Sequence, residues 1–291
     1  LWLDERMIYS CAYYRTGRED IHQAQVDKLD LICRKLRLRP GEQLLDIGCG
    51  WGALLHHAVE HFGVTGYGVT LSQEQASWAN ARFARSGIAD RCRAEVVDYR
   101  DIETGRRFDK IATIGMVEHV GVANLDTFYA GVYARLAPGG LLLSHQIVTI
   151  LERPAREGQP ASGRVLRQHN PFIQKYIFPD AEMPTIGEII ASTEKSGFEV
   201  RDVESLREHY AATFRHWHQR FEARREEVKA LLGETGYRAY RLYLAGFAPR
   251  FEHNWMGVSQ VLLSRNAARG RTNLPPGRED IYGHAGERRD P

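Results

Sequence analysis

Three glycines at alternating positions form the most distinctive chemical pattern of the sequence. An apolar segment with strand character, residues 43–47, runs directly into Gly48, Gly50 and Gly52, and a helix-forming segment follows. Glycines let a backbone turn tightly and approach a ligand without a Cβ clash, and the first turn of a helix presents polarised N–H groups. The pattern therefore predicts a loop that binds a nucleotide-like cofactor.

The spacing of these glycines distinguishes between cofactors. A dinucleotide fingerprint reads Gly-x-Gly-x-x-Gly, with an acidic residue near the end of the second strand. Here the third glycine comes one residue earlier, Asp46 precedes the loop, and residues 68–72 end the second strand without an acid. The order Asp-x-Gly-x-Gly-x-Gly is similar to the pattern of class I S-adenosylmethionine (SAM) methyltransferases. A carboxylate also suits a cofactor that carries an ammonium and a sulfonium group, so we expect SAM, with Asp46 facing it or capping the amides of the loop.

Two ionisable residues follow or occupy expected strands. Glu118 comes after the apolar strand at residues 108–114, at the carboxyl end where parallel sheets bind ligands. His145 lies inside the strand at residues 140–148, where a lone histidine is more often a core residue. We expect a site role for Glu118 and a structural role for the adjacent His119.

Neither the histidines nor the cysteines predict a metal site. His209, His216 and His218 do not share one helical face, and no acidic residue has the spacing to join them. The cysteines form no CxxC pair, which also disfavours a disulfide framework. They are Cys11, Cys33, Cys49 and Cys92.

Strand and helix patterns alternate through most of the chain. Strands are expected at residues 43–47, 65–70, 94–97, 108–114, 140–148, 199–203 and 258–263. Helices are expected at residues 21–36, 53–62, 73–86, 124–136, 185–196, 210–232 and 236–254. Such alternation predicts an α/β fold with a mostly parallel seven-stranded sheet and helices on both faces.

We expect a single domain over residues 1–265. Within it, residues 1–40 are expected to cover the cofactor site, and residues 151–183 and 206–255 to form helical or lid-like insertions over the substrate site. The first insertion is rich in proline and glycine, and long irregular segments in compact domains are usually functional. Residues 266–291 turn to Gly, Pro and Arg with little apolar content, which predicts a polar tail.

Composition excludes some classes of function. Lys and Arg number 39 against 37 Asp and Glu, a net charge of +2 that disfavours a dedicated nucleic-acid binder. No apolar run approaches the roughly 18 to 20 residues of a membrane span. We expect a cytoplasmic protein, with contact to the inner face of the membrane left open. Because the first residue is Leu1, the natural chain is expected to begin earlier.

From Leu1 to about Arg265 the chain resembles the cyclopropane-fatty-acid synthases and mycolic acid cyclopropane synthases, which have the Rossmann-like class I methyltransferase fold. The resemblance rests on short segments spread along the chain in one order. They are residues 9–13 (Tyr-Ser-Cys-Ala-Tyr), 23–36, 45–52, 68–75, 98–101 (Asp-Tyr-Arg-Asp), 115–121 (Gly-Met-Val-Glu-His-Val-Gly), 175–179 (Lys-Tyr-Ile-Phe-Pro) and 209–210 (His-Tyr).

The resemblance implies two sets of site residues. It implies SAM contacts from Tyr9, Ser10, Gly48, Cys49, Gly50, Thr70, Leu71, Ser72, Gln73, Gln75, Tyr99 and Arg100. It also implies a bicarbonate ion that acts as the base, held by Cys11, Glu118, His145, the Ile147 backbone and Tyr210.

The implied reaction is attack of a cis double bond on the SAM methyl group, followed by ring closure to a cyclopropane. Attack leaves a carbocation, which aromatic faces stabilise by roughly 0.5 to 2 kcal/mol each. Candidates for such faces are Tyr13, Tyr14, Tyr176, Phe178, Trp217 and Phe221. Ring closure requires loss of one proton from the new methyl group, and a bound anion would accept it.

Several alternatives stay open at this point. The same cation can instead yield a methylene or methyl branch, and the acyl chain can belong to a phospholipid or to a carrier-protein thioester. A phospholipid substrate would require contact with a membrane surface. A C-methyltransferase of a secondary-metabolite pathway is the rival enzyme, and a non-catalytic lipid-binding or carrier-interacting protein is the rival outside catalysis.

Overall fold

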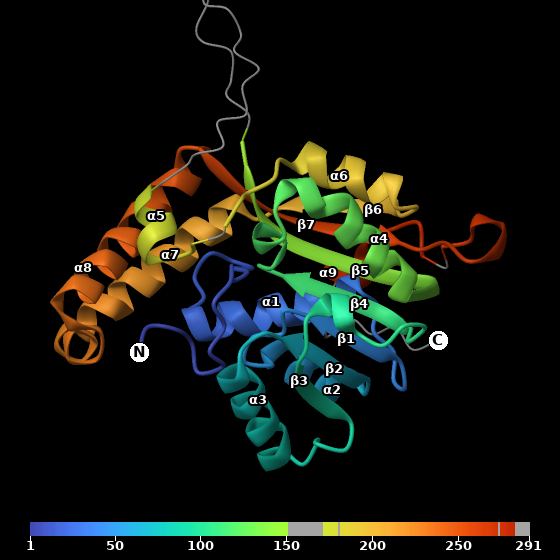
Figure 1. Ribbon diagram of the computed structural model, residues 1–291, viewed down its shortest axis with the longest axis horizontal. Helices are drawn as coiled ribbons and strands as arrows, with labels where there is room; N and C mark the ends of the chain where they lie inside the picture. The colour runs from blue at the N-terminus through green and yellow to red at the C-terminus, as the bar shows by residue number, and fades with distance from the viewer. Residues whose placement is uncertain (151–170, 180, 273, 283–291) are drawn as a thin grey trace, which may run out of the picture.

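The computed structural model describes residues 1–150, 171–179, 181–272 and 274–282, and its centre is one seven-stranded sheet (Figure 1). The strands are β1 (Gln43–Ile47), β2 (Thr65–Thr70), β3 (Cys92–Val96), β4 (Phe108–Ile114), β5 (Leu136–Thr149), β6 (Glu199–Ser205) and β7 (Met256–Ser264). Their order is β3-β2-β1-β4-β5-β7-β6. Strands β1 to β5 pair in parallel, whereas β7 pairs antiparallel with both β5 and β6. The predicted α/β fold with a mostly parallel sheet is confirmed.

Helices cover both faces of the sheet. On one face lie α1 (Ile21–Lys35), α2 (Ala53–Phe62) and α3 (Gln73–Arg85), and on the other lie α4 (Leu125–Arg135) and α6 (Ile186–Lys195). Side chains of a strand alternate between faces, so Leu44 packs with the first group while Leu45 packs with the second. Since both faces are covered, the central strands are buried along most of their length. At the start of α6, Thr185 and Glu188 form a capping box.

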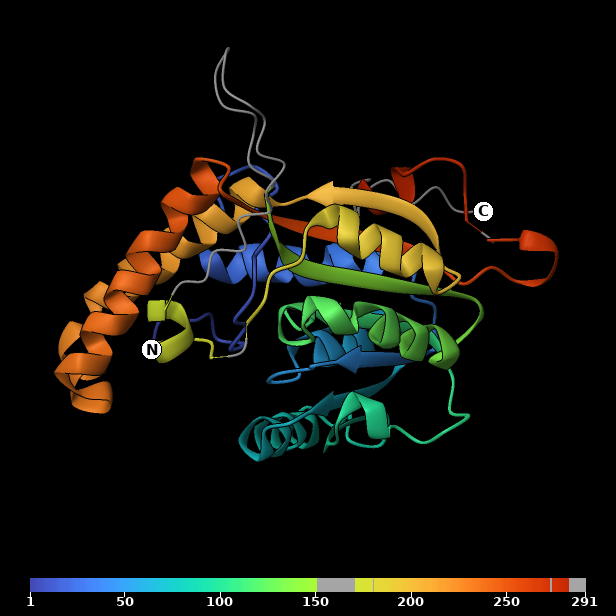
Figure 2. The ribbon, with the colours of Figure 1, turned by 45° about the horizontal axis from the view of Figure 1, so that its top comes forward.

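A helix pair extends beyond the sheet. It consists of α7 (Arg207–Ala223) and α8 (Arg225–Glu252), and the short α5 (Pro171–Tyr176) lies against it (Figure 2). The predicted end of the first helix at residue 232 is wrong, because Arg224 leaves the helical conformation with φ −115° and ψ 32°. A break near the predicted second start does exist, at Gly233, whose φ is 69°.

Aromatic side chains form the interior of this pair. Phe214, Trp217 and Phe221 of α7 are fully buried, as their i, i+3, i+7 spacing predicts for a core stripe. Phe214 packs on Phe247 and Phe251 of α8, with ring centroids 5.3 and 5.8 Å apart. The N-terminal segment joins the same cluster through Cys11, Ala12 and Tyr14. The pair is therefore packed as a rigid wall.

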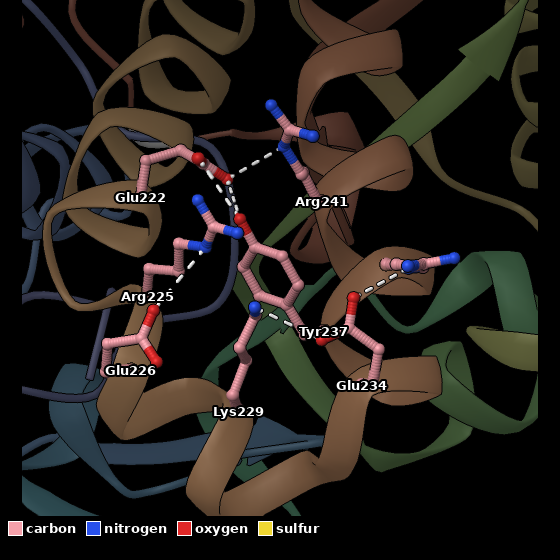
Figure 3. A network of polar contacts seen from close by, with 8 residues as sticks. Glu222, Arg225, Glu226, Lys229, Glu234, Tyr237 and Arg241 are labelled. Carbon is pink, nitrogen blue, oxygen red and sulfur yellow. Dashed lines mark hydrogen bonds and ion pairs between the residues drawn. The ribbon is translucent and has the colours of Figure 1, made fainter.

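Polar contacts tie the two helices together at the far end of the pair (Figure 3). The Tyr237 hydroxyl donates to the Glu222 carboxylate at 3.0 Å, and Arg241 Nε lies 3.1 Å from the same group. Lys229 Nζ lies 3.1 Å from Glu234 Oε2 across the break at Gly233. Residues 222–229 thus span the turn between the two helices.

The described part of the expected polar tail lies against the body of the molecule. Helix α9 (Glu279–Tyr282) contacts α1, and Ile281 is only 3% exposed. Arg37 Nε lies 2.6 Å from Asp280 Oδ2, and the Tyr282 hydroxyl donates to Glu204 at 2.9 Å. In the described ranges, no helix combines the length and apolarity that crossing a membrane requires.

Candidate active site

A cavity of about 700 Å³ opens at the carboxyl ends of the parallel strands. The N-terminal segment, the loops after β1, β2 and β4, helix α5 and the helix pair α7–α8 all contribute to its wall. Ligands of open α/β sheets bind at this edge, because loops from neighbouring strands meet there. All of the predicted site residues except Ser72 and Gln73 line the cavity.

Ser72 and Gln73 do not belong to this wall because the start of α3 uses their side chains. Ser72 is the N-cap residue, whose side chain accepts a hydrogen bond from the Gln75 N–H. Gln73 Nε2 donates to Ser77 Oγ at 3.0 Å. Leu71, just before them, lines the cavity with 76% of its surface exposed, an apolar face next to the mouth.

The three glycines after β1 all adopt left-handed backbone conformations, with φ of 77° at Gly48, 52° at Gly50 and 75° at Gly52. A Cβ at Gly52 would lie 2.7 Å from Phe83 Cζ, so this position serves the packing of α2 on α3. A Cβ at Gly50 would meet nothing within 4 Å, and Gly50 lines the cavity. Gly50 is therefore where the loop leaves room for a ligand.

The N-terminal segment is held over the cavity by hydrogen bonds from two helices. On α1, Gln25 Nε2 donates to the Ser10 carbonyl at 3.0 Å and Lys28 Nζ donates to Ser10 Oγ at 3.1 Å. On α7, Thr213 Oγ1 accepts the Ala12 N–H at 3.1 Å. These contacts place Tyr9, Ser10 and Cys11 in the wall although α7 lies about two hundred residues later.

Glu118 is a buried carboxyl group at the start of the turn after β4, in the short 3-10 helix Val117–His119. Its Oε1 accepts the Ile147 N–H at 2.7 Å, and its Oε2 has no partner among the described residues. Burial raises the pKa of Glu118 to about 7, opposed by the hydrogen bond from Ile147. Glu118 thus presents one free oxygen to the cavity.

The other members of the predicted cluster are neutral. Burial lowers the pKa of His145 well below its ordinary value, and Gln260 Nε2 donates to its Nδ1 at 3.1 Å, so the ring proton resides on Nε2. Burial raises the pKa of Tyr210 far above its usual range, and rings of Phe214 and Phe251 flank it. The Cys11 thiol, whose pKa burial also raises, donates to the Ala12 carbonyl at 3.2 Å.

One cavity wall therefore contains a buried carboxyl group with a pKa of about 7, the Tyr210 hydroxyl, the His145 ring and the glycine loop. Comparison with known proteins identifies it. Residues 1–261 match the family described as mycolic acid cyclopropane synthetase. The chain belongs to this family.

Curated relatives of the chain include a fatty acid methyltransferase and a cyclopropane synthase. Over 97% of this chain, a "Probable fatty acid methyltransferase" of Pseudomonas putida is 42% identical, and the match covers 70% of that protein. The "Cyclopropane-fatty-acyl-phospholipid synthase" of Escherichia coli K12 is 35% identical over 92% of this chain and 65% of its own length. The chain thus spans about two thirds of the length of these two relatives.

A solved structure of the family has the same fold. Mycolic acid cyclopropane synthase CmaA1, complexed with SAH and CTAB, is 33% identical with a TM-score of 0.83, covering 90% of this chain and 91% of that one. Together these matches show that the cyclopropane synthase family member described here is a SAM-dependent methyltransferase with a Rossmann-like fold.

The aromatic wall of this methyltransferase differs from the sequence-based expectation. Of the six aromatic residues proposed to face a cation, only Phe178 lines the cavity. Trp217 and Phe221 are buried inside the helix pair, and Tyr176 is 45% exposed. Tyr243 and Phe247 of α8 line the cavity instead. Their spacing on α8 repeats that of the α7 stripe, which could have indicated them.

Further polar residues of the wall were not predicted as site residues; they include Lys28, Asp98, His119, Asn124 and Thr127. His119 lines the cavity and its ring lies edge-on to Phe178, with centroids 6.0 Å apart. Lys28 lines the cavity from α1 and is fully buried. The signal for Lys28 was its position, because it follows Ile21 by seven residues and Ala24 by four and so falls on the buried face of an amphipathic helix.

His209 and His216 of α7 contact the N-terminal segment. No group of three or more His, Cys, Asp or Glu side chains in those ranges is placed to hold a metal ion. His209 accepts the Tyr14 N–H at its Nδ1 and stacks on Tyr13, with ring centroids 4.7 Å apart. This histidine thus serves to anchor the N-terminal segment.

Proposed function

We propose that this methyltransferase acts on a cis double bond of an unsaturated acyl chain and closes a cyclopropane ring there. The carrying observation is the buried Oε2 of Glu118, which has no partner among the described residues and belongs to a cavity lined by the glycine loop and by aromatic side chains. SAM, when bound, supplies the electrophilic methyl group. An apolar wall that includes Phe178, Tyr243 and Phe247 suits an acyl chain and excludes water from a cationic intermediate.

The residues of the cavity fit SAM. Gly50 leaves space for a ligand against the loop, and the exposed face of Leu71 suits a flat apolar ring. Thr70 Oγ1 donates to Gln75 Oε1 at 2.7 Å, which orients both side chains at the turn after β2. Asp46 lies in the wall with its Oδ1 unpartnered among the described residues, as suits an ammonium group.

The cluster around Glu118 also fits a bicarbonate ion, whose chemistry there would be acceptance of the proton that ring closure releases. Glu118 Oε2 can accept a hydrogen bond, while the Tyr210 hydroxyl and His145 Nε2 can donate. The Ile147 N–H already donates to Glu118 Oε1. We propose that the Ile147 N–H orients this carboxyl group, in addition to any contact that Ile147 makes with the ion itself.

The test is incubation with methyl-labelled SAM and a panel of cis-unsaturated phospholipids and acyl thioesters, followed by mass analysis of the acyl chains. We expect the acyl chain to gain one methylene group, about 14 mass units plus the label that this group retains, with loss of the double bond. Tyr210→Phe and Glu118→Gln should remove this gain. Tyr237→Phe is the matched control, since it removes one hydroxyl from a buried tyrosine of the same helix pair outside the cavity.

The outcomes separate the alternatives. Methylation that leaves a double bond in the product would replace cyclopropane formation by methyl or methylene branching. The member of the panel that gains mass identifies the acyl carrier. Label transferred to no acyl chain, although the protein binds SAM, would contradict the proposal and turn attention to small-molecule acceptors.

A further inference from the structure

Lys28 is a buried cation in the wall of the cavity. Its side chain belongs to α1, and only 1% of the residue is exposed. Nζ donates to Ser10 Oγ at 3.1 Å. In the parts of the chain that the structure describes, no carboxylate oxygen lies within 4.0 Å of this atom. An ammonium group can donate three hydrogen bonds, and the Ser10 hydroxyl accepts only one of them.

A second buried lysine on the same helix shows how this chain neutralises such a charge. Lys35 follows Lys28 by seven residues, is 0% exposed, and is paired with Glu204, with Asp202 Oδ2 3.8 Å away. Lys35 does not line the cavity. Because burial of an unpaired charge is strongly unfavourable, the unpaired lysine at the cavity indicates a ligand that brings an anion.

The wall also holds the opposite charge. Asp46 is 3% exposed, lines the cavity and lacks a partner at Oδ1 among the described residues. Burial lowers the pKa of Lys28 to about 8, opposed most by the carboxyl group of Asp4 and less by Asp46, and it raises the pKa of Asp46 to about 7, opposed by Lys28. Asp4 is buried outside the cavity wall and already accepts the Arg6 and Ile8 N–H groups, so Asp46 is the carboxyl group of the two that a ligand in the cavity can meet. A separated cation and anion on one wall match the carboxylate and ammonium of an amino acid.

We infer that Lys28 binds the carboxylate of the methionine part of SAM, while Asp46 faces its ammonium group. This inference rests on the proposed function, because it takes SAM as the cofactor. Ser10 belongs to the same contact, since its hydroxyl receives the Lys28 ammonium and its segment closes over the cavity. Lys28 and Asp46 then recognise the amino-acid part of the cofactor, whereas its nucleoside is bound by other residues of the cavity.

The test measures binding by calorimetry and needs no turnover. The ligands are S-adenosylhomocysteine, the analogue that lacks its carboxylate, and the analogue that lacks its amino group. Lys28→Met should weaken binding of S-adenosylhomocysteine by about 10- to 100-fold, as loss of a charge-assisted hydrogen bond implies. For the analogue without a carboxylate, the dissociation constant of the same variant should stay within about twofold of the wild-type value, because groups that do not interact have independent effects.

Two further variants complete the design. Asp46→Asn should show the reverse selectivity and lose affinity chiefly for ligands that carry the amino group. Lys35→Met is the matched control: it also removes a buried lysine from α1 but should leave the preference between ligands unchanged. Lys28→Gln keeps a polar side chain of similar length and serves if Lys28→Met does not fold.

The remaining outcomes overturn the inference. An equal loss of affinity for S-adenosylhomocysteine and its decarboxylated analogue would mean that Lys28 only holds Ser10 in place. If Lys28→Met bound the cofactor as the wild type does but was activated less by added bicarbonate, Lys28 would be assigned to the bicarbonate ion instead. If the wild-type protein bound no S-adenosylhomocysteine at all, the proposed function itself would fail, and this inference with it.

Discussion

Glu118 shows how position changes the chemistry of a single residue. Its carboxyl group is removed from water and receives one backbone hydrogen bond, from Ile147. Desolvation disfavours the charged form, which is why its pKa rises to about 7. The side chain therefore exchanges a proton near neutral pH, which suits a group that shares a proton with a bound anion.

Because the Glu118 carboxyl group is buried, removing its negative charge should raise the free energy of unfolding. In the unfolded chain the pKa of Glu118 is near 4.5, so between pH 4.5 and 7 the folded protein binds more protons. Stability should fall as pH rises through that window. Above pH 7, Glu118→Gln should be more stable than the wild type by up to about 3 kcal/mol, because its amide carries no charge and its oxygen can still accept the Ile147 N–H.

Urea unfolding of the ligand-free protein at pH 4 and pH 8 checks this prediction. The difference between variant and wild type should be small at pH 4 and large at pH 8. A difference that does not vary with pH would contradict the burial argument. Loss of activity in the more stable variant would place Glu118 among residues kept for function at the expense of stability.

At the scale of elements, the loop between β1 and α2 joins the sheet to the cofactor site. Gly48 and Cys49 donate their N–H groups to the Val69 carbonyl at 2.9 and 3.0 Å, which ties the loop to the end of β2. Gly52, the N-cap residue of α2, sits against Phe83 of α3. One short loop therefore fixes two helices and still presents Gly50 to the cavity.

Alanine at two of these glycines should separate folding from binding. Gly52→Ala would place a methyl group 2.7 Å from Phe83 Cζ in a left-handed conformation, and we expect it to destabilise the protein by about 2 to 5 kcal/mol. In Gly50→Ala the new methyl group meets no atom within 4 Å, so only the left-handed backbone conformation should lower the free energy of unfolding, by about 1 to 2 kcal/mol.

The measurements are chemical denaturation and S-adenosylhomocysteine affinity for both variants. Gly50→Ala should lose affinity in excess of its small loss of stability, because its methyl group enters the cavity. Equal destabilisation of the two variants would contradict the assignment of Gly52 to packing and Gly50 to the ligand.

At the scale of the whole molecule, segments from both ends of the chain meet on α1. The N-terminal segment is bound to α1 on the cavity side through Gln25 and Lys28. Helix α9 packs against the same helix through Ile281, with Arg37 and Asp280 paired beside it. None of the residues of α9 lines the cavity. The C-terminal contact should therefore support the fold and not the site.

Ile281→Ala tests that division. Removing most of a buried isoleucine should lower the free energy of unfolding by about 2 kcal/mol, while the affinity for S-adenosylhomocysteine stays unchanged. Leu231→Ala is the control, because Leu231 is 69% exposed and its truncation should have little effect on stability. A large loss of cofactor affinity in Ile281→Ala would show that α9 reaches the site through α1.

Much of the fold could be read from local patterns. The predicted bounds of β1, β2 and β4 agree with the structure, because each strand follows a glycine-containing turn, with Gly41, Gly63 and Gly105 before them. The helix pair was harder to delimit. An amphipathic pattern continues through Arg224, and only the packing of α7 on α8 decides where the chain turns. Of the insertion expected over residues 151–183, residues 151–170 and 180 lie outside the described residues, and the described part contains α5.

The sequence by itself determined the glycine loop, its acidic neighbour and the order of motifs, because these depend on backbone conformation and residue type over short distances. The tertiary structure decided the rest of the site. It placed Tyr243 and Phe247 in the cavity wall in place of Trp217, gave Glu118 its Ile147 partner, and, among the described residues, left no carboxylate oxygen within 4.0 Å of Lys28 Nζ. Burial and pairing arise between segments far apart in the chain, so only the packed molecule sets them.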